Sequence, residues 1–152
     1  MFNQVSIIGC GLIGSSILRR LNKNKLIKKL VAYDNDKSVR EILKKKNFCN
    51  EISSSPSEAV KNSDLVLIST PLSSFETVIN SIKNDLSPGS ILTDTCSVKR
   101  GVNEIIKKIN LKNSIWIPGH PVAGTENSGP DSGFADLFQD RWTILTPDKN
   151  IK

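Results

Sequence analysis

The chain has 152 residues, 38% of them hydrophobic and 24% charged, with a formal net charge of +6. This length suits one compact domain and is too short for two, and the composition is that of an ordinary globular protein, not a disordered one. The lysines fall in short clusters without aromatic residues between them, so we expect a solvated basic surface and no nucleic-acid binding. A mild positive field also suits an anionic cofactor or substrate.

Cysteine usage and hydropathy indicate the compartment. Cys10, Cys49 and Cys96 are odd in number and far apart, which predicts neither a disulfide framework nor a metal site. No apolar run approaches the roughly 18 residues of a membrane helix, and no basic segment precedes a signal-type apolar core. We therefore expect a cytoplasmic protein that binds no metal and no membrane.

Short β-branched runs alternate with amphipathic stretches of helical length, a pattern that predicts a parallel sheet built from βαβ units. We expect a Rossmann-type doubly wound α/β fold over residues 1–152, with a mainly parallel sheet and helices on both faces. The predicted helices are Leu12–Asn22, Ser57–Lys61, Ser74–Lys83 and Val98–Ile109, of which the middle two open near a serine that can cap them. The predicted strands are Val5–Ile8, Leu30–Tyr33, Leu65–Ser69, Ser90–Thr93, Ile115–Ile117 and Trp142–Leu145.

A glycine-rich turn follows the first predicted strand and opens the first predicted helix, with the sequence G-C-G-L-I-G at residues 9–14. Gly9 permits a tight turn, Gly11 lets a pyrophosphate approach the backbone, and Gly14 allows the helix to pack closely on the strand. The free N–H groups of the helix N-terminus, at Leu12 and Ile13, complete a predicted phosphate site. The run alone is a weak signal, and its position between strand and helix strengthens it.

Asp34 ends the second predicted strand, 20 positions after Gly14, where dinucleotide-binding folds have an acidic residue on the ribose hydroxyls. A carboxylate there repels the 2′-phosphate of NADP, so NAD is the predicted cofactor. The alternative is that Asp34 only begins a turn with Asn35. Asp36 is assigned to capping the next helix.

Thr70 and Pro71 follow the strand predicted at Leu65–Ser69, at the sheet edge where doubly wound folds bind ligands. We expect them to line the cofactor near its ribose or nicotinamide. The competing interpretation is a Thr-Pro pair that simply ends a strand.

His120 is the only histidine, so it is the only imidazole available for acid–base catalysis. It lies in a stretch rich in glycine and proline, from Pro118 to about Gly133, which is predicted to be irregular, and loops of this length are usually functional. Gly119 and Pro121 restrict the backbone on either side of it. This setting favours a catalytic histidine over a structural one at the surface.

Four stretches of the chain occur together in one known family. They are the glycine turn, D-T-C-S-V-K at residues 94–99, G-H-P-V-A-G-T-E at residues 119–126, and W-T-I-L-T-P at residues 142–147. Their combination resembles the prephenate and arogenate dehydrogenases, and the resemblance covers essentially the whole chain. It implies NAD-dependent oxidation of a small-molecule substrate, prephenate or arogenate, in tyrosine biosynthesis.

The resemblance also implies roles for individual residues. His120 corresponds to the histidine that hydrogen-bonds the ring hydroxyl of the substrate and takes its proton, and Ser97 to the serine that orients the histidine or hydroxyl near the nicotinamide. From the residues alone, Ser97 also suits an N-cap of the helix predicted to begin at Val98. Thr125 and Glu126 are further candidates for orienting the loop or contacting the substrate, against the alternative of a solvated turn.

Members of this family continue into a helical domain that forms a homodimer and supplies cationic groups for the substrate carboxylates. The resemblance therefore implies that the C-terminal domain is absent here and that the chain alone is incomplete for turnover. Two alternatives stay open: a dehydrogenase or reductase for another small acid, and a non-catalytic NAD-binding module whose partner does the chemistry.

Overall fold

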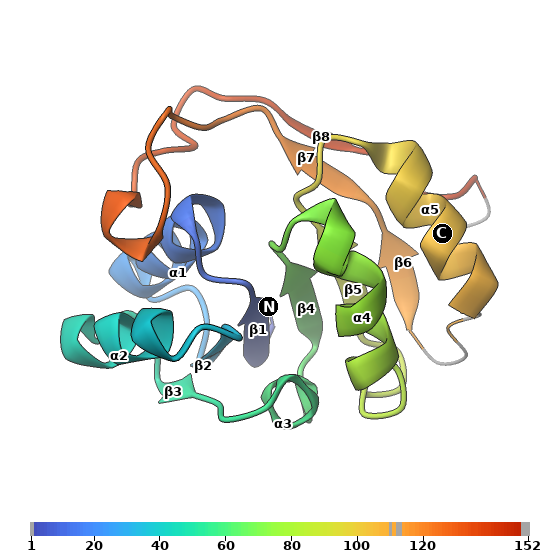
Figure 1. The fold of residues 1–152 in the computed structure, drawn as a ribbon, viewed down its shortest axis with the longest axis horizontal. Helices are drawn as coiled ribbons and strands as arrows, with labels where there is room; N and C mark the ends of the chain where they lie inside the picture. The colour runs from blue at the N-terminus through green and yellow to red at the C-terminus, as the bar shows by residue number, and fades with distance from the viewer. Residues whose placement is uncertain (1, 110, 112–113, 150–152) are drawn as a thin grey trace.

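Residues 2–109, 111 and 114–149 are described by the structure, a computed structural model whose centre is a parallel sheet of six strands (Figure 1). The strands lie in the order β3-β2-β1-β4-β5-β6, so the chain starts at the centre, runs to one edge, returns, and runs to the other. This is the expected doubly wound α/β fold of Rossmann type. The bounds are β1 (Gln4–Ile8), β2 (Lys29–Tyr33), β3 (Glu51–Ile52), β4 (Leu65–Ile68), β5 (Ile91–Asp94) and β6 (Ile115–Ile117).

Helices cover both faces of this sheet, and each face has its own apolar core. Successive residues of a strand point to opposite faces, which is why Ile7 and Ile8 belong to different cores. One core contains Leu18 and Leu43 from the first two helices, and the other contains Phe75 from a later helix. The first face carries α1 (Leu12–Asn24) and α2 (Lys37–Lys46), and the second carries α3 (Pro56–Val60), α4 (Leu72–Ile82) and α5 (Lys99–Ile109).

The helix N-termini confirm two predicted caps and correct a third. The Asp36 carboxylate accepts from the N–H of Ser38 at 2.7 Å and caps α2, as expected. Ser55 caps α3 by accepting from the N–H of Glu58 at 3.2 Å. The serine cap predicted for α4 is wrong, because α4 begins directly after Pro71 and has no side-chain cap; the fixed φ of proline suits a helix start.

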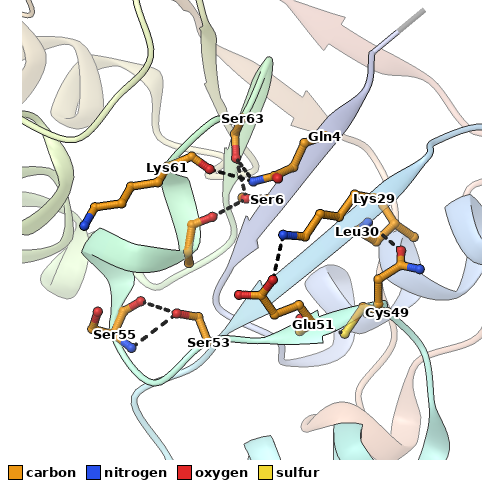
Figure 2. A network of polar contacts seen from close by, with 12 residues as sticks. Gln4, Ser6, Lys29, Leu30, Cys49, Glu51, Ser53, Ser55, Lys61 and Ser63 are labelled. Atoms are coloured by element: carbon orange, nitrogen blue, oxygen red, sulfur yellow. Dashed lines mark hydrogen bonds and ion pairs between the residues drawn. The ribbon is translucent and has the colours of Figure 1, made fainter.

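A buried hydrogen-bond network joins the start of β1 to the segment that runs from α3 to β4 (Figure 2). The side-chain amide of Gln4 donates to the Ser63 hydroxyl at 2.9 Å and to the Lys61 carbonyl at 2.7 Å. Ser6 donates to the carbonyl of Ala59 at 2.5 Å and shares a hydrogen bond of 2.7 Å with Ser63. Leaving such buried polar groups unpaired costs about 1–3 kcal/mol each, so the network favours a single placement of β1 against this segment.

The last predicted strand does not join the parallel sheet. Residues Thr143–Leu145 form β8, which pairs antiparallel with β7 (Gly119–Pro121), and β7 lies in the stretch that was predicted to be irregular. Strands of three residues carry too little periodicity to reveal their partners or direction. Between them, the short 3₁₀ turn η1 (Pro130–Ser132) lies beside α1 (Figure 1).

Candidate active site

The glycine turn lies at the carboxyl end of β1, between β2 and β4, where the strand order reverses. Gly9 has a φ of +90°, and its N–H donates to the carbonyl of Tyr33 at 2.8 Å. A Cβ on Gly9 would lie 2.7 Å from the carbonyl oxygen of Ser69, and one on Gly14 would lie 2.0 Å from the Gly9 carbonyl oxygen. A Cβ on Gly11 would meet nothing within 4 Å. The turn is therefore tightly packed at Gly9 and Gly14 and open to a ligand at Gly11.

Asp34 is buried beside this turn. Its carboxylate accepts from the N–H of Cys10 at 2.7 Å and from the N–H of Asp36 at 2.9 Å. The bond from Cys10 joins the end of β2 to the glycine turn, and the bond from Asp36 is local, so the turn-forming role considered as an alternative is present. An ionised carboxylate has about four lone-pair sites, and Asp34 also lines a hollow at this edge of the sheet, so it can accept from a ligand as well.

Two hollows flank the glycine turn, and Thr70 and Pro71 line both of them. The Thr70 hydroxyl oxygen is buried and has no hydrogen-bond partner within the described part of the chain, so a ligand crossing between the hollows can satisfy it. Their volumes, about 530 Å³ and 430 Å³, fall within the range of small-molecule sites. The first is also lined by Gly9, Gly11, Asp34 and the start of α4, and the second by Leu12, Ile13, Ser97 and residues 127–129.

Ser97 is exposed and lines the second hollow beside Cys96. Helix α5 begins at Lys99, so Val98 lies between Ser97 and the first residue of the helix. Ser97 therefore borders the second hollow just before the helix begins.

His120 lies on β7 and lines a third hollow of about 260 Å³, whose walls are mostly apolar. Its Nδ1 atom is buried and has no hydrogen-bond partner among residues 2–109, 111 and 114–149. Buried ring nitrogens normally have a partner, so this nitrogen is available to a bound molecule. Ser97 and His120 line different hollows, and Thr95 lines both. The two candidate residues therefore do not share one cavity.

Thr125 and Glu126 are exposed, and neither lines the hollow of Ser97 or that of His120. The Thr125 hydroxyl accepts from the N–H of Asn127 at 3.2 Å, which shapes the loop. The structure thus gives Thr125 a loop-forming contact and does not bring Glu126 next to the other candidates.

Contacts that hold the loop after β7 against α1 were not predicted. The carbonyl of Pro130 accepts from the Ser15 hydroxyl at 3.2 Å and from the Arg19 guanidinium at 2.9 Å. A Cβ on Gly133 would lie 2.2 Å from the Ser15 hydroxyl oxygen, so the chain crosses α1 in close contact. These contacts keep residues 127–129 at the wall of the second hollow. The two polar residues were visible in the sequence, but no pattern there shows what they contact.

A buried ion pair was also missed. Asp94 ends β5, and its carboxylate lies 2.5 Å from the Lys99 ammonium. Like Asp34, it is an acidic residue at the carboxyl edge of the sheet, which is the one signal that could have marked it. The pair lies between the loop of Ser97 and the strand of His120.

Burial raises the pKa of all three cysteine thiols, to about 11 for Cys49 and Cys96 and well above the ordinary value for Cys10. Burial therefore favours the protonated form of these thiols at neutral pH. Among the described residues, no group of three or more His, Cys, Asp or Glu side chains could hold a metal ion. No described helix is long and apolar enough to cross a membrane.

Comparison with known proteins gives one consistent result. A family model for the prephenate dehydrogenase nucleotide-binding domain matches residues 17–152. The chain is 40% identical to a cyclohexadienyl dehydrogenase of Zymomonas mobilis, over 97% of this chain and 50% of that protein. It is 29% identical to a prephenate dehydrogenase of Lactococcus lactis, over 94% of this chain and 40% of that protein. The chain thus spans half or less of the length of these relatives.

Solved structures agree. A prephenate dehydrogenase from A. aeolicus, in complex with hydroxyphenyl propionate and NAD⁺, matches 100% of this chain and 53% of its own, with a TM-score of 0.87 and 26% identity. Arogenate dehydrogenase from Synechocystis matches 96% of this chain and 50% of its own, with a TM-score of 0.85 and 27% identity. The similarity extends over about half of each of these proteins.

Proposed function

Since this chain belongs to the family of prephenate dehydrogenase nucleotide-binding domains, we propose that it binds NAD⁺ and contributes to the oxidation of prephenate or arogenate in tyrosine biosynthesis. The observation that carries this proposal is the glycine turn between two ligand-sized hollows at the carboxyl edge of the sheet. The A. aeolicus relative, solved with NAD⁺, supports the choice of cofactor.

The residues around the turn fit a dinucleotide. The open space at Gly11 and the N–H groups at the start of α1 suit a pyrophosphate. We assign the adenosine to the first hollow, where Asp34 accepts from the ribose diol and disfavours the additional phosphate of NADP⁺. The nicotinamide is assigned to the second hollow, past the unpaired hydroxyl of Thr70 and beside Ser97.

Proton transfer is assigned to this chain. When bound, NAD⁺ accepts a hydride from the carbinol carbon of the substrate. His120 acts as the general base and takes the proton of the carbinol hydroxyl on an imidazole nitrogen, while Ser97 orients the histidine or that hydroxyl. The carbinol carbon becomes a carbonyl, the ring carboxylate leaves as CO₂, and the electrons of the broken bond aromatise the ring to a phenolate, which becomes a phenol by taking back the proton from His120.

Substrate carboxylates need cationic partners from elsewhere. None of the described side chains that line the hollows of Ser97 and His120 is cationic, whereas prephenate carries two carboxylates. We assign their binding to a helical, dimer-forming domain like that of the family. The apolar side chains exposed on and beside β8 support this, since Trp142 is 82% exposed and exposed apolar patches usually mark an interface.

A non-catalytic NAD-binding role is the second candidate. It is favoured by the separation of Ser97 and His120 into different hollows, because turnover requires both residues to act on one substrate. The two functions can be told apart in the same protein. Both require cofactor binding, and only the dehydrogenase function requires hydride transfer.

The test joins this chain to the second half of the Z. mobilis relative and follows NADH formation with prephenate and with arogenate. We expect turnover by the joined protein and negligible turnover by the chain alone. His120→Asn should lower kcat by about 10²- to 10⁴-fold with NAD⁺ affinity nearly unchanged, and Ser97→Ala should be milder. Full kcat in His120→Asn would refute the base assignment. NAD⁺ binding without turnover of either substrate would favour the non-catalytic role or oxidation of another small acid.

A further inference from the structure

The ion pair of Asp94 and Lys99 differs from the surface pairs of this protein. Its side chains are 0% and 19% exposed, whereas those of a pair such as Arg20 and Asp136 are 41% and 49% exposed. Burying charges is costly unless they are paired and fully hydrogen-bonded. The hydrogen bonds of this pair show which backbone groups it holds in place.

Both members of the pair bind the backbone of Gly119. Asp94 Oδ1 accepts from the Gly119 N–H at 3.1 Å, and Lys99 Nζ donates to the Gly119 carbonyl at 2.5 Å. Asp94 Oδ2 accepts from Lys99 Nζ at 2.5 Å and from the N–H of Cys96 at 2.9 Å. One ion pair therefore holds both backbone polar groups of Gly119 and is itself tied to the loop after β5.

These contacts connect the two segments that carry the candidate catalytic residues. Gly119 directly precedes His120, and Ser97 lies two residues before Lys99. Gly119 itself is closely packed, because a Cβ there would lie 3.0 Å from the carbonyl oxygen of Asp94. A change in the ion pair is thus transmitted to the backbone of both segments.

We propose that Asp94 and Lys99 are positioning residues that set the place of His120 relative to Ser97. The proposal rests on the function proposed above for the roles of those two residues. A buried ion pair adds little net stability compared with apolar side chains of the same volume. It does impose a geometry, and misplacement of a reacting group by about 1 Å can lower a rate by on the order of 10²-fold.

Three variants separate positioning from folding. Lys99→Met alone leaves a buried, unpaired carboxylate and can unfold the chain, so the decisive variant is the double change Asp94→Asn with Lys99→Met. Lys99→Arg keeps a cation that can donate to both acceptors and serves as the rescue. Arg100→Met is the matched control, because Arg100 adjoins Lys99, is 90% exposed and pairs with Glu104 at the surface.

The measurement uses the single imidazole of the chain. Its ring-proton NMR signals need no assignment against other histidines and report on the surroundings of His120 directly. We expect one set of signals in the wild type, Lys99→Arg and Arg100→Met, and a shifted or multiple set in the double variant, with the same Kd for NAD⁺ in all four. In the joined protein, the double variant should lose about 10²-fold in kcat with little change in KM for NAD⁺, and Lys99→Arg should regain most of it.

Unaltered imidazole signals in a folded double variant would overturn the proposal. Loss of the folded state in the double variant, seen by circular dichroism while Lys99→Arg stays folded, would make the pair a structural element and overturn it as well. Failure of the proposed function looks different: His120→Asn would then retain full kcat, and the imidazole signals would still show whether the ion pair positions the ring.

Discussion

Replacing Asp34 should affect both the fold and the cofactor, and two substitutions separate the effects. The carboxylate accepts two backbone N–H groups in a buried setting, and hydrogen bonds to a charged group contribute about 1.5–3 kcal/mol each. Asp34→Ala removes both and should cost about 3–6 kcal/mol, a large part of the roughly 5–15 kcal/mol that stabilises a typical domain. Asp34→Asn keeps one acceptor oxygen and should cost about half as much.

Cofactor binding gives the second readout. If Asp34 also accepts from the ribose diol, the loss of a charged acceptor in Asp34→Asn should weaken NAD⁺ binding by about 10- to 100-fold, since 1.4 kcal/mol is tenfold in Kd. NADP⁺ binding should weaken less or improve, because the repulsion of its additional phosphate is removed. Calorimetric titration with both nucleotides, beside urea unfolding, measures the two effects separately.

The control for this experiment is Asp36→Asn, two residues along, where the side chain is exposed and caps α2. It should leave the preference for NAD⁺ over NADP⁺ unchanged. If Asp34→Asn lowers stability and yet has the wild-type Kd for both nucleotides, the carboxylate serves the glycine turn alone and the reasoning about the ribose is refuted.

Two further predictions concern the loop over α1 and the thiols. Gly133→Ala should weaken NAD⁺ binding severalfold in a titration, because the new Cβ would lie 2.2 Å from the Ser15 hydroxyl oxygen. Gly124→Ala is the control and should not weaken it, because a Cβ there meets nothing within 4 Å. Equal NAD⁺ affinity in both variants would show that this loop does not shape the cofactor site. The thiols of Cys49 and Cys96 have a pKa of about 11 in the folded chain against an ordinary value of 9.0. Below pH 9 this difference leaves the stability of the fold in full. Between pH 9 and 11 the thiols of the unfolded chain ionise first, so stability should be lost. Urea unfolding across that range should show a shallower decline in a variant with both cysteines replaced by alanine, and an identical decline would contradict the assignment.

The inner strands of the sheet and the edge strand β6 were predictable, whereas the edge strand β3 and the pairing of β7 with β8 were not. Strand β4 is a continuous apolar run, as expected for a strand covered on both faces, so composition alone identifies it. Strand β3 escaped prediction because it has two residues, Glu51 and Ile52, at the edge of the sheet. The antiparallel pairing of β7 with β8 depends on a contact between distant segments, which no local pattern encodes.

The candidate site divides in the same way. The place of Asp34 beside the glycine turn was predictable, because one βαβ unit separates the two and gives a fixed offset in sequence. The link from Asp94 to Gly119 spans 25 positions through a helix and a strand whose packing sets the distance, so no offset marks it. Sequence reasoning therefore reached a residue at a fixed offset from a motif and missed one whose contact depends on how distant segments pack.

The packing of the glycine turn has a consequence for synthesis of the chain. The motif is complete once Asp34 has been made, but the wall against which Gly9 packs is formed by Ser69 and Thr70. Until β4 (Leu65–Ile68) emerges from the ribosome, β1 has one open edge, because it pairs with β2 on one side and β4 on the other. Domains form from the N-terminus onward during translation, and unpaired edges are where growing chains misassemble. A nascent chain that already carries the whole glycine motif therefore keeps one edge of β1 unpaired until its fourth strand has been added.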